Sequence, residues 1–484
     1  MTSSIGIGIA LAPGAGFYPV IVAGFLLPGL VLLAWGAYML RTRELLHATP
    51  GFFVWLGYIQ FAMLGFYANL ERYGQYSPSD FWQASLLLAA GLLMFIWGYY
   101  SAGNLTLWYR KIQPQPFFSG LPQNLSRRLG FILAFCLGSA GILSMMYIVS
   151  LVGGPIAFLK LPYGADVLNL RNLTVVDKMA LFILQTFLPG ATTLSIAILV
   201  RGGCSRVQRL LLWVFLMSFL LYGLMSKIRG YIISPFLSYI FLRMALPDRA
   251  FRRSEIPKLF FIAFSALFIA YVIGEARKVE GGLFSIIEGP LAGQGDIREF
   301  IGGTFDHYYW LIDVMREIPS QRPLLFGWTL ISPFLTLVPR DVWANKPYGF
   351  GKLVLVWQGV PFESPVSTGT LLITELYANF WVPGTLILMF IQGRLCAKLY
   401  RFFLKHHREP IAASLYLTLI GCFAMVRGDF HSGATASIYK ALGVFIPAWI
   451  IYRGIKPRPV GKVVGFAYAG QSPASIPGSL KSRT

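Results

Sequence analysis

The sequence contains few charged residues. Asp, Glu, Lys and Arg make up 13% of its 484 residues, whereas soluble domains carry about a quarter. Hydrophobic residues make up 56%, and the mean hydropathy over the whole chain is +0.62. This composition excludes an ordinary soluble domain and predicts an all-α polytopic integral membrane protein.

Cysteines and catalytic signature motifs are also scarce. The sequence has four cysteines and no CxxC or Cys/His spacing, so neither a disulfide framework nor a zinc site is expected. No P-loop, GxGxxG, HExxH or GxSxG motif occurs in a fitting context. Without these motifs, the sequence gives no support to ATP hydrolysis or zinc proteolysis. We expect no cofactor and no bound metal.

Long apolar runs dominate what is present. A spanning helix needs about 20 mostly apolar residues. Because the N-terminus has no basic region ahead of its first apolar run, we expect no cleaved signal peptide. The runs predict about eleven spans, at roughly 16–40, 51–69, 81–101, 129–152, 179–200, 210–226, 230–247, 259–275, 371–393, 411–427 and 435–452.

Lys and Arg are distributed unevenly between the loops. The chain holds 41 basic and 20 acidic residues, an excess of 21. This excess lies in alternate loops, so we attribute it to membrane orientation and not to nucleic-acid binding. Because Lys and Arg are enriched in the cytoplasmic loops of membrane proteins, this distribution predicts a periplasmic N-terminus and a cytoplasmic C-terminus. The basic segments are 41–43, 109–128, 201–209, 243–258, 394–409 and the tail from Arg453.

The spacing of the spans divides the chain into four parts. Residues 1–275 form an N-terminal bundle of about eight spans, 276–370 a long external loop, and 371–455 the C-terminal spans. Residues 456–484 are rich in Ser, Pro, Gly and Lys, which predicts a disordered cytoplasmic tail. The long loop exceeds a simple connector and should fold. Within it, 296–318 has the spacing of an amphipathic helix at the membrane surface, and 324–339 that of a re-entrant or interfacial segment.

Several ionisable and aromatic side chains are expected at the outer ends of spans or in the long loop. Arg and Lys bind phosphate oxygens, carboxylates and histidines can deprotonate a sugar hydroxyl, and aromatic rings offer apolar faces to sugars. The predicted pyrophosphate-binding residues are Arg340, Lys346, Arg427, Lys227 and Arg229. The predicted catalytic residues are Glu375, Asp429, His431 and His307, and the predicted sugar-stacking residues are Trp343 and Tyr308.

Each of these residues also has a structural interpretation. Lys227 and Arg229 fit contacts to lipid headgroups as well as they fit a binding role. The histidines, taken singly, are typical interfacial residues. Glu375 lies within a predicted span, where a carboxylate is functional or paired in most cases.

The C-terminal half, about 225–455, resembles a known family. The matching segments are "KIRG" (227–230), "PRDVW…KP" (339–347), "STGTLLITELYANFWVPG" (367–384) and "VRGDF" (426–430). Together with the late external loop, they resemble the Wzy-type oligosaccharide repeat-unit polymerases of bacterial O-antigen and exopolysaccharide pathways.

The resemblance implies a GT-C-like fold in the bacterial inner membrane and a metal-independent glycosyltransferase. Such an enzyme acts at the periplasmic face, moving the growing glycan from undecaprenyl pyrophosphate onto the next lipid-linked repeat unit. The implied partners are the undecaprenyl-pyrophosphate-linked donor and acceptor, membrane lipids, a chain-length regulator and a flippase, with no nucleic acid.

Two other functions remain open at this stage. An O-antigen ligase, which transfers glycan to the lipid A core, shares a large external loop with Arg and His, although "TELYANFWVPG" favours the polymerase. A flippase or transporter of lipid-linked sugars would show inverted repeats or paired broken helices, and the sequence shows neither. A purely structural role would leave Glu375 and the outer arginines unexplained.

Overall fold

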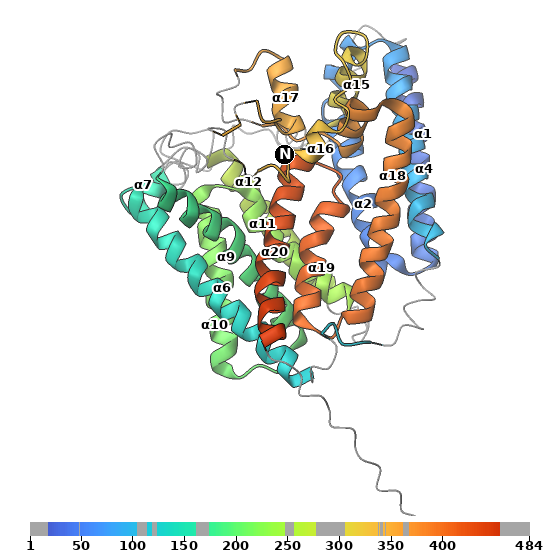
Figure 1. Cartoon of the computed structure of the whole chain (residues 1–484). Helices are drawn as coiled ribbons and strands as arrows, with labels where there is room; N and C mark the ends of the chain where they lie inside the picture. Colours follow the sequence, from blue (N-terminus) through green and yellow to red (C-terminus); the bar gives the residue numbers. More distant parts are fainter. Residues whose placement is uncertain are drawn as a thin grey trace, which may run out of the picture.

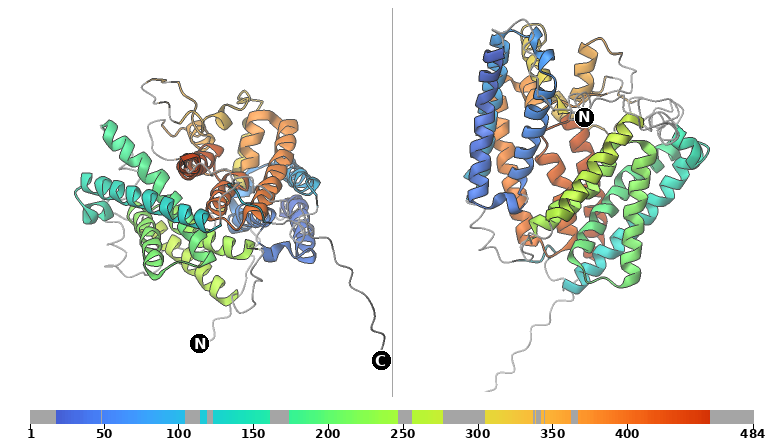
Figure 2. Two further views of the ribbon diagram at one scale, coloured as in Figure 1. Left: turned by 60° about the horizontal axis from the view of Figure 1, so that its bottom comes forward. Right: turned by 180° about the vertical axis from the view of Figure 1, so that it is seen from behind.

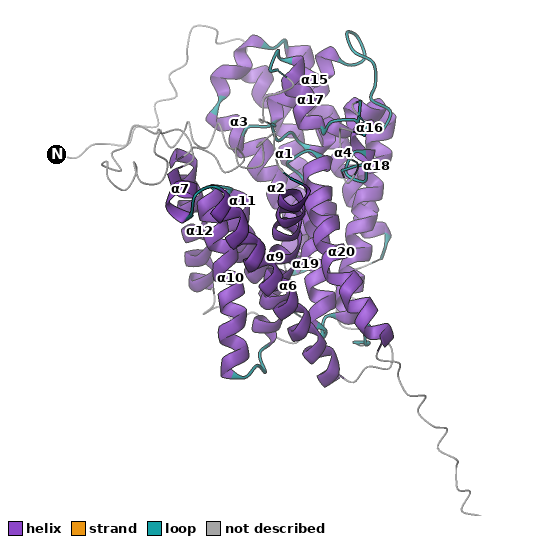
Figure 3. Ribbon diagram, turned by 60° about the vertical axis from the view of Figure 1, so that its left-hand side comes forward, coloured by secondary structure: helices purple, strands orange, loops and turns teal. Residues whose placement is uncertain are grey.

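The computed structural model describes residues 18–47, 49–103, 114–118, 123–160, 174–246, 256–276, 305–336, 338, 342–343, 345–361 and 367–454. Over these ranges the chain is helical, with no strand and a single isolated antiparallel bridge between Leu371 and Arg427 (Figure 3). The predicted all-α class is therefore confirmed for the described part of the chain.

The N-terminal helices pack with the longest C-terminal helix. They are α1 (Tyr18–Arg41), η1 (Glu44–His47), α2 (Pro50–Tyr58), the π-helical turn η2 (Ile59–Leu64), α3 (Gly65–Ala68), η3 (Leu70–Gln75) and α4 (Pro78–Ser101). Helix α4 packs against α1 and against α18 (Leu372–His406) (Figure 1). At Gly98 and Gly393 the α4 and α18 backbones approach so closely that a Cβ on either glycine would collide with the other helix. Small residues allow such close packing between membrane helices.

A second group of helices forms the other side of the molecule. It contains α6 (Gln123–Leu151), α7 (Pro155–Lys160), α9 (Val175–Arg201), α10 (Arg206–Ser226), α11 (Arg229–Ala245) and α12 (Ile256–Ala276). Helices α19 (Pro410–Phe423) and α20 (Phe430–Gly454) lie between the two groups, because α19 contacts both α18 and α9 (Figure 2).

Six described helices are long and apolar enough to cross a membrane: α4, α6, α9, α10, α18 and α20. Their outward faces carry large apolar side chains such as Trp97 (62% exposed) and Leu143 (67% exposed). Such a surface is stable in lipid and unfavourable in water. The protein is therefore membrane-embedded. A helix lies at each of the eleven predicted positions, but crossing by all eleven stays a prediction.

The described part of the long loop packs onto the spanning helices. It contains α15 (Tyr308–Glu317), α16 (Trp328–Ile331) and α17 (Phe350–Trp357), which lie at the same end of the molecule (Figure 1). Basic residues from separate helix ends gather at the opposite end, where Arg127 of α6 and Arg201 of α9 line one pocket with Pro410. The segments predicted on opposite sides of the membrane are thus at opposite ends of the bundle.

Helix α15 lies within a segment predicted to be amphipathic. The spacing of 296–318 predicts a helix on or near the membrane surface, and residues 296–304 lie outside the described residues. Helix α15 itself packs against α4 and α18, and its residues from Tyr308 to Ile312 are buried. Amphipathic spacing reveals an apolar face but not what covers it, and here the cover is protein.

Candidate functional site

A break in helix α18 organises the site. Trp381 has φ 56° and ψ −165° within the helix, and Pro383 follows two residues later. Because proline has no N–H, it cannot donate to the carbonyl of Asn379 four residues earlier. The Phe326 N–H donates to that carbonyl instead, at 3.1 Å, and the Leu325 N–H donates to the Ala378 carbonyl at 3.0 Å. The broken helix thus holds the apolar segment that leads into α16.

Asn379 fixes this segment further. Its Oδ1 accepts a hydrogen bond from the Gly327 N–H at 2.8 Å, and its Nδ2 donates to the Thr329 hydroxyl at 2.7 Å and to the Glu375 carbonyl at 2.8 Å. Gly327 has φ 84°, which favours glycine. The "GW" turn before α16 is therefore tied to the same face of α18 that carries Glu375.

Glu375 is fully buried in the first turn of α18. Its Oε2 accepts a hydrogen bond from the Phe430 N–H at 2.6 Å. That N–H belongs to the first residue of α20, where helical N–H groups have no partner within the helix and favour negative charge. One oxygen of this side chain is therefore hydrogen-bonded, and it joins the start of α18 to the start of α20. The other oxygen, Oε1, is buried and makes no hydrogen bond to a described residue.

Asp429 and His431 lie beside this junction. The Asp429 carboxylate caps α20, accepting hydrogen bonds from the Ser432 N–H at 3.0 Å and from the Ser432 hydroxyl. It is close enough to Glu375 for the two carboxylates to repel each other. The Nδ1 of His431 is 2.8 Å from the hydroxyl of Ser332, just after α16. Two carboxylates and an imidazole therefore meet at one place.

Gly349 completes this group of side chains. A Cβ at this position would collide with the Asp429 carboxylate and lie 2.9 Å from the His431 Cβ. Only glycine lets the 345–350 backbone approach so closely. The "PYGFG" stretch that follows Lys346 is therefore part of the site.

Arg427 is held by backbone pairing with the residues around the start of α18. The Leu372 N–H donates to the Val426 carbonyl at 2.8 Å, and the Gly428 N–H donates to the Thr370 carbonyl at 2.9 Å. The guanidinium of Arg427 lies over the Phe61 ring, 5.2 Å from the ring centroid. The side chain reaches solvent but is surrounded by protein atoms. The desolvation by these protein atoms, with the nearby charge of Arg229 as a second cause, lowers the pKa of Arg427 to about 10.

Two like charges held close to one another favour an anion between or beside them. Arg229 opens α11, and Arg427 lies just before α20. The structure thus brings together two predicted pyrophosphate-binding residues that are far apart in sequence. Phe61, in the π-helical turn η2, was not predicted; π-helical turns are frequent at functional sites, but no sequence pattern marks this one.

The two lysines predicted to bind pyrophosphate, Lys346 and Lys227, do not share the surroundings of Arg427. Lys346 is buried, and its ammonium donates hydrogen bonds to the carbonyls of Val338 at 3.0 Å and Thr336 at 3.4 Å. We therefore assign it to bracing the segment after α16. Lys227 is fully buried, has φ 54° and forms the C-cap of α10. Arg340 lies outside the described residues.

His307 lies near the site, whereas Tyr308 does not belong to it. The His307 N–H donates to the Phe61 carbonyl at 3.3 Å, and its ring lies 5.8 Å from the Phe61 ring. Tyr308 is fully buried among aromatic rings, and its hydroxyl is 2.8 Å from that of Ser85. This position corrects the prediction of a sugar-stacking Tyr308, because neither ring face is open.

Asp306 is also part of the core. It accepts hydrogen bonds from the Tyr73 hydroxyl and from the Asn69 amide at 3.0 Å. Burial raises the pKa of Asp306 above its ordinary value, and these bonds oppose the rise. Within the described ranges, no three His, Cys, Asp or Glu side chains are grouped as a metal site would require.

Trp343 and the segment around α16 present an apolar surface next to the site. Phe326, Trp328 and Phe334 are 71%, 53% and 63% exposed, and Val342 and Trp343 are also exposed. Buried Thr329 and Ser332 on the same segment contact Asn379 and His431. The segment thus presents apolar side chains outward and polar ones toward the site, as expected for an interfacial position.

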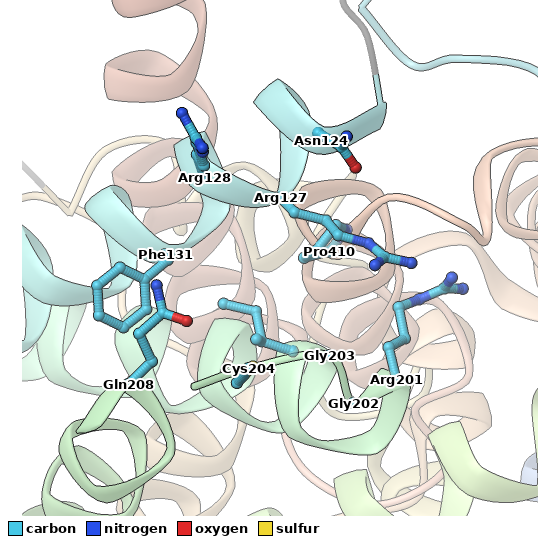
Figure 4. A pocket seen from close by; sticks show the side chains of 11 residues that line it. Asn124, Arg127, Arg128, Phe131, Arg201, Gly202, Gly203, Cys204, Gln208 and Pro410 are labelled. Carbon is cyan, nitrogen blue, oxygen red and sulfur yellow. The ribbon is translucent and has the colours of Figure 1, made fainter. Parts of the chain in front are cut away.

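A pocket of about 260 Å³ lies at the opposite, basic end of the bundle. Figure 4 shows Arg127, Arg128 and Arg201 around it, with Cys204 and Gln208 on the facing side. Its described lining contains no carboxylate or histidine, the usual groups for acid–base chemistry. The arginines that line this pocket belong to the basic segments from which the membrane orientation is predicted.

Comparisons with known proteins do not add to this picture. No protein-family model matches the chain, and neither a curated protein nor a solved structure matches it. The functional interpretation therefore depends on the geometry around Glu375, Arg427, Asp429 and His431.

Proposed function

We propose that the protein is a lipid-linked oligosaccharide polymerase of the Wzy type. It would join undecaprenyl-pyrophosphate-linked repeat units into O-antigen or another exopolysaccharide at the periplasmic face of the bacterial inner membrane. The proposal includes eleven spans in a GT-C-like arrangement, a periplasmic N-terminus and a cytoplasmic C-terminus. The orientation rule supports this arrangement, because the basic loops lie at the end away from the site.

One observation carries the proposal: Glu375, Asp429 and His431 meet where α18 and α20 begin. Arg427, two residues before Asp429 in the chain, and Arg229 supply positive charge at the same end of the helices. A lipid pyrophosphate brings its charge to this depth, and an acceptor sugar brings a hydroxyl that must lose its proton. The exposed apolar surface around α16 suits the lipid part of such a substrate.

The residues then take distinct roles. Arg427 and Arg229 bind the donor pyrophosphate. His431, the most exposed of the three acid–base side chains, takes the proton of the acceptor hydroxyl, while Ser332 orients its ring. The acceptor oxygen bonds to the anomeric carbon of the growing chain, and the bond from that carbon to undecaprenyl pyrophosphate breaks. Glu375 and Asp429 stabilise the imidazolium that forms.

A deletion of the gene tests the proposal. Loss of a polymerase should leave surface glycan as single repeat units on the lipid A core, visible as one band above the core on a gel. Loss of a ligase would leave the core bare, and loss of a flippase would leave lipid-linked units inside the cell. An unchanged ladder of long chains would refute all three functions.

A further inference from the structure

A small polar chamber lies within the spanning helices, apart from the proposed catalytic site. It has a volume of about 130 Å³ and is lined by α9, α10, α11, α19 and α20. Its polar lining comprises Thr192, Thr193, Ser234, Ser238, Thr418, Ser437 and Lys440. Among the described residues, no acidic side chain lines it. A space of this size holds several water molecules or a small anionic group.

Lys440 is the charged residue of this chamber. It lies ten residues after Phe430, the first residue of α20, and thus about 15 Å along the helix at 1.5 Å per residue. Its ammonium makes no hydrogen bond or ion pair with any other described residue. A charge at this depth is unfavourable without a partner, and such residues mark binding sites and transport pathways in most membrane proteins.

The hydroxyl groups of the chamber fall into two kinds. Those of Thr192, Thr193 and Thr418 donate within their own helices, to the carbonyls of Leu188 at 2.8 Å, Gly190 at 2.9 Å and Ser414 at 2.9 Å. The Ser234, Ser238 and Ser437 hydroxyls make no hydrogen bond to another described residue. These three serines and Lys440 therefore present donors to the chamber, which is what an anion requires.

An apolar groove adjoins the chamber. It has a volume of about 330 Å³, is lined by α9, α10, α11 and α12, and shares Ile196 and Pro235 with the chamber. The rest of its lining is apolar or aromatic, including Trp213, Leu216 and Leu220. A hydrocarbon chain suits such a lining.

We infer that chamber and groove together bind a phosphate-bearing lipid. The phosphate accepts hydrogen bonds from the Lys440 ammonium and the three serine hydroxyls, and the hydrocarbon chain lies in the groove. This site is separate from Arg427 and Glu375, and the inference does not depend on the proposed glycan transfer.

The inference is tested by thermal unfolding of the purified full-length protein in detergent with and without ligand. A ligand that binds only the folded state raises the midpoint temperature of unfolding. Dioleoyl phosphatidic acid is the probe. Diacylglycerol, which lacks the phosphate, and inorganic phosphate, which lacks the hydrocarbon chains, are the controls. Phosphatidic acid should raise the midpoint of the wild type. Equal stabilisation by diacylglycerol would refute a phosphate site, and equal stabilisation by inorganic phosphate would refute a lipid occupant.

Three variants locate the binding. Lys440→Met should weaken phosphatidic acid binding at least tenfold, whereas Lys178→Met, on the exposed first turn of α9, should bind as the wild type does. Leu220→Trp, which fills the groove, should also weaken binding, and it tests the inference even if Lys440→Met fails to fold. Equal affinity of the Lys440→Met or Leu220→Trp variant and the wild type would overturn the assignment.

Discussion

Replacing Arg427 by alanine should abolish most activity while leaving the fold intact. Its backbone pairs with the residues around the start of α18 through main-chain groups, which alanine retains. The guanidinium lies over Phe61, and such a contact is worth about 0.5–1 kcal/mol at an exposed position. The variant should therefore lose no more than about 1 kcal/mol of stability.

The expected effect on catalysis is larger. The nearby positive charge of Arg229 helps to lower the pKa of Arg427, and a bound pyrophosphate would relieve this repulsion. Removing one guanidinium from a bound phosphate costs about 2–5 kcal/mol, a rate loss of roughly thirty- to several-thousand-fold. Arg427→Lys should recover part of the rate, because it keeps the charge but loses the two-pronged contact.

The assay is chain-length analysis of surface glycan at matched levels of membrane-inserted protein. Arg322→Ala is the control, because Arg322 also lies over an aromatic ring, that of Trp357 at 5.0 Å, and pairs with Glu317, both side chains being partly exposed. Such exposed pairs contribute about 1 kcal/mol or less, so this variant should polymerise normally. Wild-type chain lengths in both Arg427→Ala and Arg229→Ala would refute the pyrophosphate assignment.

Further predictions concern the packing, the pH dependence, the topology and the metal requirement. Gly349→Ala should push the 345–350 backbone away from Asp429 and His431 and lower the polymerisation rate, whereas Gly454→Ala, which meets no atom within 4 Å, should not. Burial raises the pKa of Glu44 to about 7, so the folded protein holds this proton more tightly than the unfolded chain. The wild type should then lose about 3 kcal/mol of stability as the pH rises from about 4.5 to 7, and Glu44→Gln should remove that slope in thermal unfolding. Reporter fusions after Arg128, Arg209, Arg253 and Arg408 should read cytoplasmic, and those near Gly327 and Ser432 periplasmic; a reversed reading would contradict the orientation. A chelator should leave polymerisation unchanged, and a loss that one divalent ion restores would contradict metal independence.

The positions of the helices could be predicted because long apolar runs are a local property of the sequence. The predicted spans 179–200 and 210–226 correspond to α9 (Val175–Arg201) and α10 (Arg206–Ser226). Polar residues at the helix ends escaped the apolar criterion, and here Thr174 and Ser205 cap the two helices through capping boxes.

Contacts between distant segments were not predictable in this way. The proline of "NFWVPG" is evident in the sequence. The sequence does not show that the N–H groups of Leu325 and Phe326 donate to the carbonyls of 378 and 379. Tyr308 lies in a run of aromatic residues. The periodicity of this run does not reveal whether membrane or protein covers it. Lys440 was different: a lysine inside an apolar run is a recognisable signal of a binding site or pathway, and it lies within the predicted span 435–452.

The most direct test of polymerisation is reconstitution of the purified protein in liposomes with a lipid-linked repeat unit from the host strain as the only substrate. We predict a ladder of lipid-linked products containing two, three and more units, and its loss in the Arg427→Ala variant at equal protein content. A reaction in which the single unit stays unchanged, with protein that is folded and correctly oriented, would contradict the proposed function.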